Sequence, residues 1–217
     1  LLSRGLGDVY KRQIPSMFLA GKKANALGHI VLLDPVGAGA SRLRTDTAKR
    51  LMQEVRFDAV RGNISEVKTL CTGSGSTKGV DADAVDAVTE ANLDNGVQLV
   101  KTFAAQTGCI ITVTGAIDLV SDGERCWCIR NGRAEMSRIT GTGCQLSALM
   151  TAFLVANPDR KLDAAAAAVC MMGLAGEIGW ANMQPDDGNS TYRNRIIDAI
   201  FNMTGDALEE GAKYELR

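Results

Sequence analysis

Short apolar runs alternate along the chain with segments of helical spacing, and this alternation is the strongest constraint on the fold. The runs "HIVLLD" (29–34), "FDAV" (57–60) and "CIITV" (109–113) have the length and composition of buried strands. A segment with apolar residues at helical spacing separates each run from the next. Strands that alternate with helices favour an α/β fold, with a doubly wound, mostly parallel sheet and helices on both faces.

Helices are expected between and after these strands. Their predicted ranges are 16–28, 45–55, a start at 63–71, one ending near 103–108, and then about 144–156, 162–182 and 191–215. A loop is expected at 76–83, and a hairpin at 117–130, where Asp122 and Gly123 suit the positive φ angles of a tight turn. At 217 residues, without a linker or an internal repeat, the chain fits one domain.

The first thirteen residues, "LLSRGLGDVYKRQ", do not continue the pattern that follows them. They have neither the apolar core of a signal peptide nor the periodicity of a helix or strand. Residues 3–13 resemble one reading-frame translation of the end of a widely used transposase sequencing adapter. We therefore expect residues 1–13 to be a non-native or disordered tail, and residues 14–217 to form a domain that lacks its own N-terminal part.

Composition limits the class of partner. Lys plus Arg number 24 against 25 for Asp plus Glu, a net charge of -1 that offers no broad basic surface for nucleic acid or an anionic membrane. The longest weakly polar stretch, 162–183, is rich in Ala and Gly and contains two acids, which favours a buried helix over a membrane span. The six cysteines lack the spacing of a disulfide framework, which fits a reducing cytoplasm. A single histidine and no CxxC motif argue against zinc.

The motif "RITGTGCQLSALM" (138–150) places a cysteine where a glycine-rich turn meets an apolar helix. Gly141 and Gly143 permit close backbone approach, and the helix start offers free N–H groups and a positive dipole end. Together these features form an anion pocket suited to phosphate. The alternative is an ordinary glycine turn with Cys144 as a small buried residue, and for this motif in isolation that alternative is favoured.

Three more loops follow predicted strands and carry polar groups. In "RGNISE", Arg61 could hold a phosphate and Glu66 could organise magnesium directly or through water, although Asn63 and Glu66 also match a capping box. In "LLDPVGAGASRLR", Asp34 ends a buried strand, where an uncompensated carboxylate is costly; a simple turn residue is the alternative. In "ITVTGAID", Thr114 could meet a phosphate or could merely satisfy a turn. The coincidence of four such loops favours phosphoryl transfer.

The motifs "LLDPVGAGASRLRT", "RGNISE", "VTGAIDLVSDG" and "TGTGCQLSA" together resemble those of the hydroxyethylthiazole kinase family, which has a ribokinase-like fold. The resemblance runs in order from about residue 14 to the C-terminus. Relatives in the wider superfamily usually carry aspartate at the position of Cys144, so the cysteine is the residue that discriminates between them.

The resemblance implies transfer of the ATP γ-phosphate, with Mg²⁺, to the hydroxyl of 4-methyl-5-(2-hydroxyethyl)thiazole in thiamine salvage. It also implies a cytoplasmic protein that forms a homotrimer when full length. The implied roles are catalysis for Cys144, ATP binding for Arg61 and Thr114, thiazole binding for Gly141, an anion hole for Gly141, Thr142 and Gly143, and the magnesium region for Asp34 and Glu66.

Two other functions stay open. One is another ribokinase-like enzyme, such as a hydroxymethylpyrimidine kinase or an ATP-dependent hydrate dehydratase. The other is a nucleotide-binding module without catalysis, because the family's early thiazole-binding residues cannot be placed before residue 14. We expect this chain by itself to bind the thiazole poorly.

Overall fold

The computed structural model describes residues 2–72, 77–78, 81–82 and 87–217. Its helices are α1 (Leu2–Ala26), α2 (Arg42–Glu54), α3 (Ile64–Thr72), α4 (Leu93–Thr107), α5 (Thr142–Ala156), α6 (Lys161–Ala181), α7 (Asn189–Asn202) and α8 (Gly205–Gly211), with short 3-10 turns at Glu90–Asn92 and Ala134–Arg138. Its strands are β1 (Leu32–Leu33), β2 (Ala59–Asn63), β3 (Thr77–Lys78), β4 (Asp81–Ala82), β5 (Ile110–Thr114), β6 (Asp118–Ser121), β7 (Cys126–Ile129) and β8 (Tyr214–Leu216).

Six strands form one sheet in the order β1-β2-β5-β6-β7-β8. The pairs β1·β2 and β2·β5 are parallel, while β5·β6, β6·β7 and β7·β8 are antiparallel. The expected α/β class is therefore confirmed, but the sheet is mixed rather than mostly parallel. The reason is the hairpin β6–β7, because a short turn can join only antiparallel strands.

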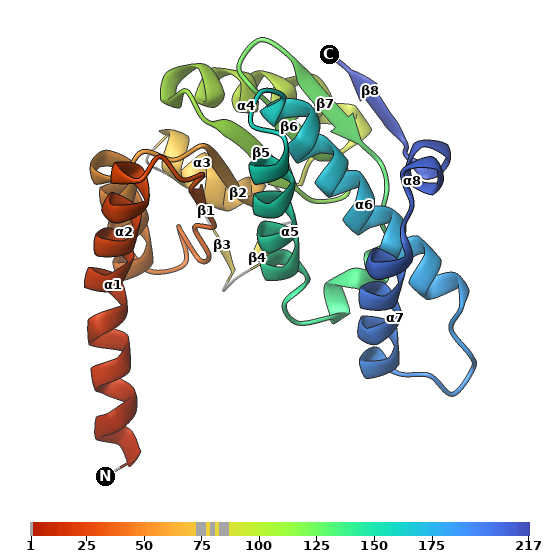
Figure 1. The fold of residues 1–217 in the computed structure, drawn as a ribbon, viewed down its shortest axis with the longest axis horizontal. Helices are drawn as coiled ribbons and strands as arrows, with labels where there is room; N and C mark the ends of the chain where they lie inside the picture. The colour runs from red at the N-terminus through yellow and green to blue at the C-terminus, as the bar shows by residue number, and fades with distance from the viewer. Residues whose placement is uncertain (1, 73–76, 79–80, 83–86) are drawn as a thin grey trace.

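Helices cover both faces of the sheet, as Figure 1 shows. The side chains of each strand alternate between the two faces, so Val60 and Ile111 pack into one core while their neighbours Ala59 and Ile110 pack into the other. The first core receives apolar residues from α1, α2, α3 and α4, and the second receives them from α5, α6 and α7. Burial on both faces explains why "CIITV" reads as an unbroken apolar run.

Two expectations about the ends of the chain are wrong in their secondary structure. Residues 2–13 are not irregular: α1 begins at Leu2 and continues through Pro15 to Ala26, and its first half extends away from the other elements in Figure 1. Pro15 lies inside this helix, where it donates no backbone hydrogen bond and its ring crowds the carbonyl four residues earlier. Whether these residues are native stays a prediction.

The expected last helix, 191–215, is divided. α7 ends at Asn202, Thr204 caps the short α8 through its hydroxyl, and β8 then joins the sheet edge beside β7. Strand pairing with β7 outweighs the local helical pattern here. The expected loop at 76–83 contains the short strands β3 and β4, and its other residues lie outside the described part of the chain.

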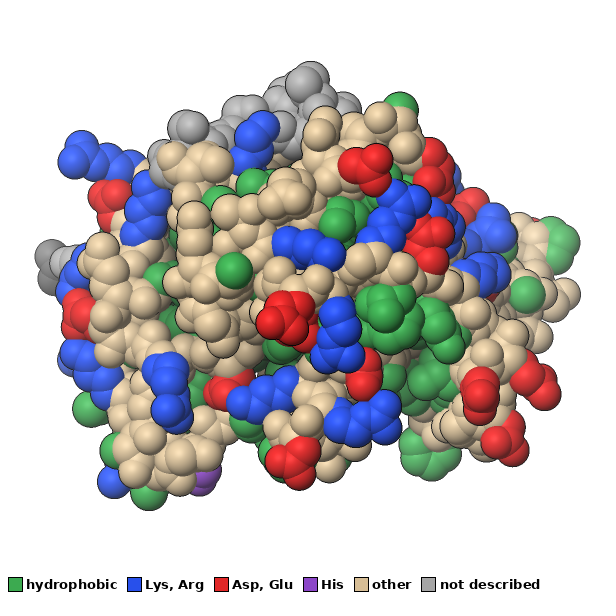
Figure 2. Space-filling view, turned by 90° about the horizontal axis from the view of Figure 1, so that it is seen from above, with side chains coloured by type: hydrophobic (Ala, Val, Ile, Leu, Met, Phe, Trp, Pro, Cys, Tyr) green, Lys and Arg blue, Asp and Glu red, His purple; other side chains and the backbone are tan. Residues whose placement is uncertain are grey.

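The helix α6 is long and apolar enough to pass a simple test for a membrane span, but 67% of its most apolar window is buried within the fold. It is therefore the buried core helix that the sequence predicted. The described cysteines, all six of them, are free thiols. On the face shown in Figure 2, Lys and Arg side chains are interspersed with Asp and Glu, in keeping with the balanced composition.

Candidate active site

The ends of β1, β2 and β5 meet the N-terminal end of α5. In the parallel half of the sheet, Asn63 at the end of β2 is paired in register with Thr114 at the end of β5, and Asp34 directly follows β1. The helix α5 packs on the sheet through Leu146, Met150 and Leu154, which recur every four residues and are buried. This packing brings the glycine turn before α5 to the same edge as the three strand ends.

Arg61 links the predicted positions to one another. Its Nη2 donates to Thr114 Oγ1 at 2.8 Å, and its Nη1 lies 3.5 Å from Asp34 Oδ2. The side chains of Arg61 and Asp34 are only 13% and 17% exposed, so their charges are weakly screened by water. Thr114 in turn donates to the carbonyl of Gly62 at 3.4 Å. Three residues that are far apart in the sequence therefore form one polar chain.

The guanidinium of Arg61 lies directly against the start of α5. A Cβ placed on Gly143 would be 2.6 Å from Arg61 Nη1 and 3.0 Å from Nη2. A side chain at this position would force the Arg61 guanidinium to move, so glycine allows the close approach of this cation to the helix backbone. Gly141 precedes α5 with φ of +94°, a conformation that favours glycine.

The first turn of α5 has the properties of an anion site. The N–H of Gln145 bonds to the carbonyl of Gly141, and the N–H groups of residues 142–144 precede the first position that has an acceptor within the helix. The positive end of the helix dipole and the Arg61 guanidinium act on the same point in space. Phosphate is the class of ligand that this arrangement favours.

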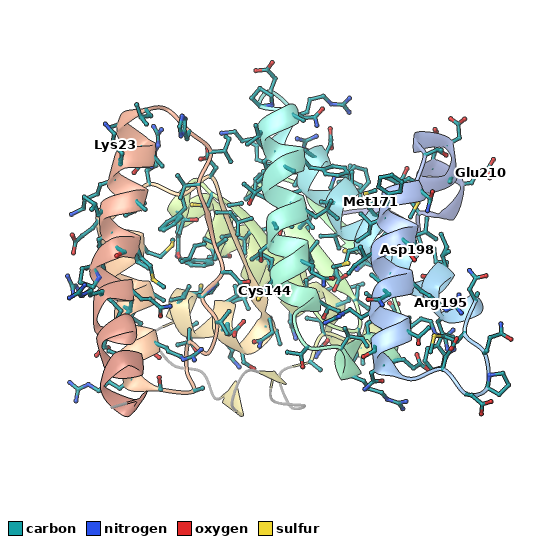
Figure 3. The ribbon with its side chains drawn as sticks, turned by 60° about the horizontal axis from the view of Figure 1, so that its bottom comes forward. Lys23, Cys144, Met171, Arg195, Asp198 and Glu210 are labelled. Atoms are coloured by element: carbon teal, nitrogen blue, oxygen red, sulfur yellow. The ribbon has the colours of Figure 1, made fainter. Side chains whose placement is uncertain are left out.

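Cys144 is exposed, so the alternative in which it is a buried filler is wrong. Figure 3 shows it on α5, between α1 on one side of the view and α7 on the other. It lies one helical turn before Ser147, and residues three apart share a face of a helix. Because Ser147 reaches Asp34, we infer that Cys144 projects on the side of α5 that faces this carboxylate.

Ser147 is a site residue that the sequence analysis missed. Its hydroxyl donates to Asp34 Oδ2 at 2.8 Å across a separation of 113 residues. The other oxygen, Oδ1, is buried without a hydrogen-bond partner among the described residues, as is Nε of Arg61. An orphaned carboxylate oxygen is costly in a protein interior and is a ready ligand for a hard divalent cation. Asp34 is therefore more than a turn residue.

Glu66 is 4% exposed and holds two backbone segments together. Its Oε1 accepts from Gly37 N at 2.7 Å and its Oε2 accepts from Asn63 N at 2.9 Å, while Asn63 Oδ1 accepts from Glu66 N at 2.9 Å. Burial raises the pKa of Glu66, and these two N–H donors act in the opposite direction. The capping arrangement with Asn63 is confirmed, so Glu66 positions the loop after β1 and each of its oxygens already accepts one N–H.

Asp118, at the start of β6, is a second residue that the sequence analysis missed. Its Oδ1 accepts from Gly115 N at 2.8 Å and so closes the loop that follows Thr114. Burial raises the pKa of Asp118 to about 7, while the Gly115 N–H and the charge of Arg61 lower it. A GxxD spacing after a strand is the sequence signal that could have identified this residue.

The structure thus brings together Asp34, Arg61, Thr114 and Gly143, and Cys144 directly follows Gly143 in α5. No group of three or more His, Cys, Asp and Glu side chains with the geometry of a metal site occurs among the described residues. Asp34 has a buried carboxylate oxygen without a hydrogen-bond partner among the described residues.

Comparison with known proteins gives consistent matches. The model of the Hydroxyethylthiazole kinase family matches residues 2–206. A protein named hydroxyethylthiazole kinase from Clostridium acetobutylicum is 50% identical over 214 residues, which span 99% of this chain and 78% of that protein. One from Clostridium beijerinckii is 42% identical over 210 residues, spanning 97% of this chain and 75% of that one.

Solved structures give the same picture of the fold. The hydroxyethylthiazole kinase protein from Pyrococcus horikoshii OT3 superposes with a TM-score of 0.80 at 27% identity, covering 94% of this chain and 72% of that one. The pyridoxal kinase from Staphylococcus aureus in complex with AMP-PCP and pyridoxal gives a TM-score of 0.57 at 17% identity, covering 94% and 69%, and this likeness concerns the fold alone. The expected ribokinase-like fold is confirmed.

Proposed function

Because the chain belongs to the hydroxyethylthiazole kinase family, we propose that it transfers the γ-phosphoryl group of ATP to the hydroxyl of 4-methyl-5-(2-hydroxyethyl)thiazole, a step of thiamine salvage. The observation that carries this proposal is the polar chain Asp34–Arg61–Thr114 at the N-terminal end of α5. Phosphoryl transfer depends mainly on positioning and on stabilising negative charge, and this edge of the sheet is built for both.

In this proposal Arg61 and Thr114 hold the nucleotide. The guanidinium of Arg61 is restrained by Thr114 at 2.8 Å, so little side-chain freedom is lost when a phosphate binds to it. The backbone of Gly141, Thr142 and Gly143 forms the anion hole for the transferred group, since α5 presents its first N–H groups there. Gly141 also borders the thiazole, as the family resemblance implies.

Cys144 is proposed as the catalytic residue that meets the substrate hydroxyl. It is exposed and lies in the first turn of α5, beside the proposed anion hole. The hydroxyl oxygen then attacks the γ-phosphorus, the bond to the leaving ADP oxygen breaks, and the Cys144 sulfur, acting in its thiolate form, takes up the hydroxyl proton and becomes a thiol.

The residues present fit a magnesium ion. Asp34 supports this assignment, since its Oδ1 is buried without a partner among the described residues. Glu66 is proposed to act on the metal region indirectly. Its Oε1 accepts from Gly37 N at 2.7 Å and so positions the loop that follows Asp34. When bound with ATP, magnesium neutralises charge on the phosphate oxygens.

Assembly and location are proposed on further grounds. Ile197 and Phe201 of α7 are 45% and 87% exposed, and an apolar pair on one face of a helix supports burial in an oligomer, for which we propose a homotrimer. A cytoplasmic location is supported by the six free thiols.

The test is an ADP-release assay on purified protein with the thiazole alcohol, the hydroxymethylpyrimidine alcohol, or no acceptor. Release that depends on the thiazole alcohol supports the proposal. Release that depends on the pyrimidine alcohol would point to the related kinase, and ATP binding without acceptor-dependent release would point to a module without catalysis. The Cys144→Ala variant serves as the matched catalytic control.

A further inference from the structure

Asp34 is held asymmetrically. Both of its described contacts reach the same oxygen: the Ser147 hydroxyl donates to Oδ2 at 2.8 Å, and Arg61 Nη1 lies 3.5 Å from Oδ2. Oδ1 is buried and has no partner among the described residues. The Arg61–Asp34 contact is longer than the 2.7–2.9 Å that is typical of a charge-assisted hydrogen bond. Ser147 therefore makes the shorter contact with an oxygen that Arg61 could otherwise bind.

An arginine and a carboxylate this close would ordinarily close into a bidentate pair. Two parallel N–H···O bonds are the preferred geometry, and here a second bond from the guanidinium would also satisfy the orphaned Oδ1 of Asp34. The observed arrangement leaves that oxygen unpaired instead. The hydroxyl of Ser147 is bonded to Oδ2, the same oxygen that Arg61 Nη1 faces at the longer distance of 3.5 Å.

We propose that Ser147 is a positioning residue, whose hydroxyl keeps Asp34 from closing onto Arg61 so that both groups stay available to a cation-bound nucleotide phosphate. This inference rests on the proposed function, since it assigns Ser147 a role in the same nucleotide site. Ser147 itself need not touch the substrate. Its effect passes through the orientation of the Asp34 carboxylate.

The experiment measures the affinity of the 217-residue chain for ADP with Mg²⁺ by calorimetry, without any thiazole alcohol. Ser147→Ala removes the hydroxyl without threatening α5, since alanine is the better helix former. We expect about tenfold weaker binding, because the Arg61–Asp34 pair that then closes must open before a phosphate can bind, at the cost of about one charge-assisted hydrogen bond. Ser147→Thr retains the hydroxyl and is expected to bind within about twofold of the parent. The control is Thr151→Ala, one turn further along α5, where the hydroxyl bonds only to the backbone carbonyl of residue 147 in the described structure.

The Ser147→Ala change is also made in the Arg61→Lys variant, to separate a positioning role of Ser147 from a general effect on the structure. Lysine at position 61 retains the positive charge but cannot form the bidentate pair. In Arg61→Lys, the additional loss caused by Ser147→Ala is therefore expected to shrink to less than about threefold. An undiminished loss in that background would overturn the inference, as would parental binding by Ser147→Ala. If the unsubstituted chain failed to bind Mg²⁺-ADP, the proposed nucleotide site would fail together with this inference.

Discussion

Replacement of Gly143 by alanine tests whether the start of α5 is a binding surface or only a helix cap. The added Cβ would lie 2.6 Å from Arg61 Nη1, 3.0 Å from Nη2 and 3.2 Å from Cζ, so the guanidinium must move. Arg61 is 13% exposed and tied to Thr114, so its movement breaks a hydrogen bond that involves a charged group, worth about 1.5–3 kcal/mol. Alanine offsets this by about 1 kcal/mol through its higher helix propensity.

The net loss of folding free energy should therefore be small, about 0.5–2 kcal/mol. The loss in nucleotide affinity should be larger in effect, because a displaced Arg61 forfeits its charge-assisted contact with phosphate. A cost of about 1.5–3 kcal/mol corresponds to roughly 10- to 150-fold weaker binding of Mg²⁺-ADP. Urea unfolding measures the first quantity and calorimetry measures the second.

Gly205→Ala is the matched control for this change. Gly205 is also in the first turn of a helix, and a Cβ there would meet nothing within 4 Å. Its affinity for Mg²⁺-ADP should equal that of the parent. Parental affinity in Gly143→Ala would refute the reasoning, because it would mean that Arg61 acts from a different position than the one observed.

Three further outcomes are expected. Cys144→Ala should slow phosphoryl transfer at least tenfold while Mg²⁺-ADP affinity stays parental, and unchanged turnover would remove the proposed catalytic role. For Asp118→Asn, the free energy of unfolding of the variant minus that of the parent should increase as the pH rises from 5 to 7, by about 1.4 kcal/mol per pH unit. The pKa of Asp118 is raised to about 7 in the fold, so native protein holds a proton there that the unfolded chain has released, and parental stability falls with rising pH up to that value. Urea unfolding at pH 5, 6 and 7 tests this, and a pH-independent difference would contradict it. Gly173→Ala should cost about 1–3 kcal/mol in the same assay, since its Cβ would lie 2.7 Å from the Asn131 backbone; an unchanged midpoint would show that this loop yields freely.

Local patterns were sufficient for much of the fold. Strand-like runs and helical spacing depend on neighbouring residues, so the expected helices and strands from residue 29 to 182 correspond to observed ones, with bounds shifted by a few residues. The short strands β3 and β4, within the expected loop at 76–83, were not expected. The expectation failed where a distant partner decides the outcome. Thr204 is a helix cap within 191–215 and is a local signal for a break, but no local pattern announces β8, because this strand forms by pairing with β7.

The candidate site shows the same division between local and distant information. The sequence by itself determined which loops carry phosphate-type groups, because parallel strands end at a common edge and their following loops must converge there. It also predicted that Cys144 lies at the start of a helix, and α5 confirms that position.

Only the tertiary structure decided how these groups share their contacts. In the fold, Arg61 lies against Gly143, and Ser147 bonds to Asp34 across 113 residues. The carboxylate of Glu66 accepts hydrogen bonds from the backbone N–H groups of Gly37 and Asn63. The contacts of Ser147 and Gly143 depend on how α5 packs on the sheet, which spacing along the sequence does not specify. Sequence spacing identifies the groups, but only three-dimensional distance determines which of them stays free for a ligand.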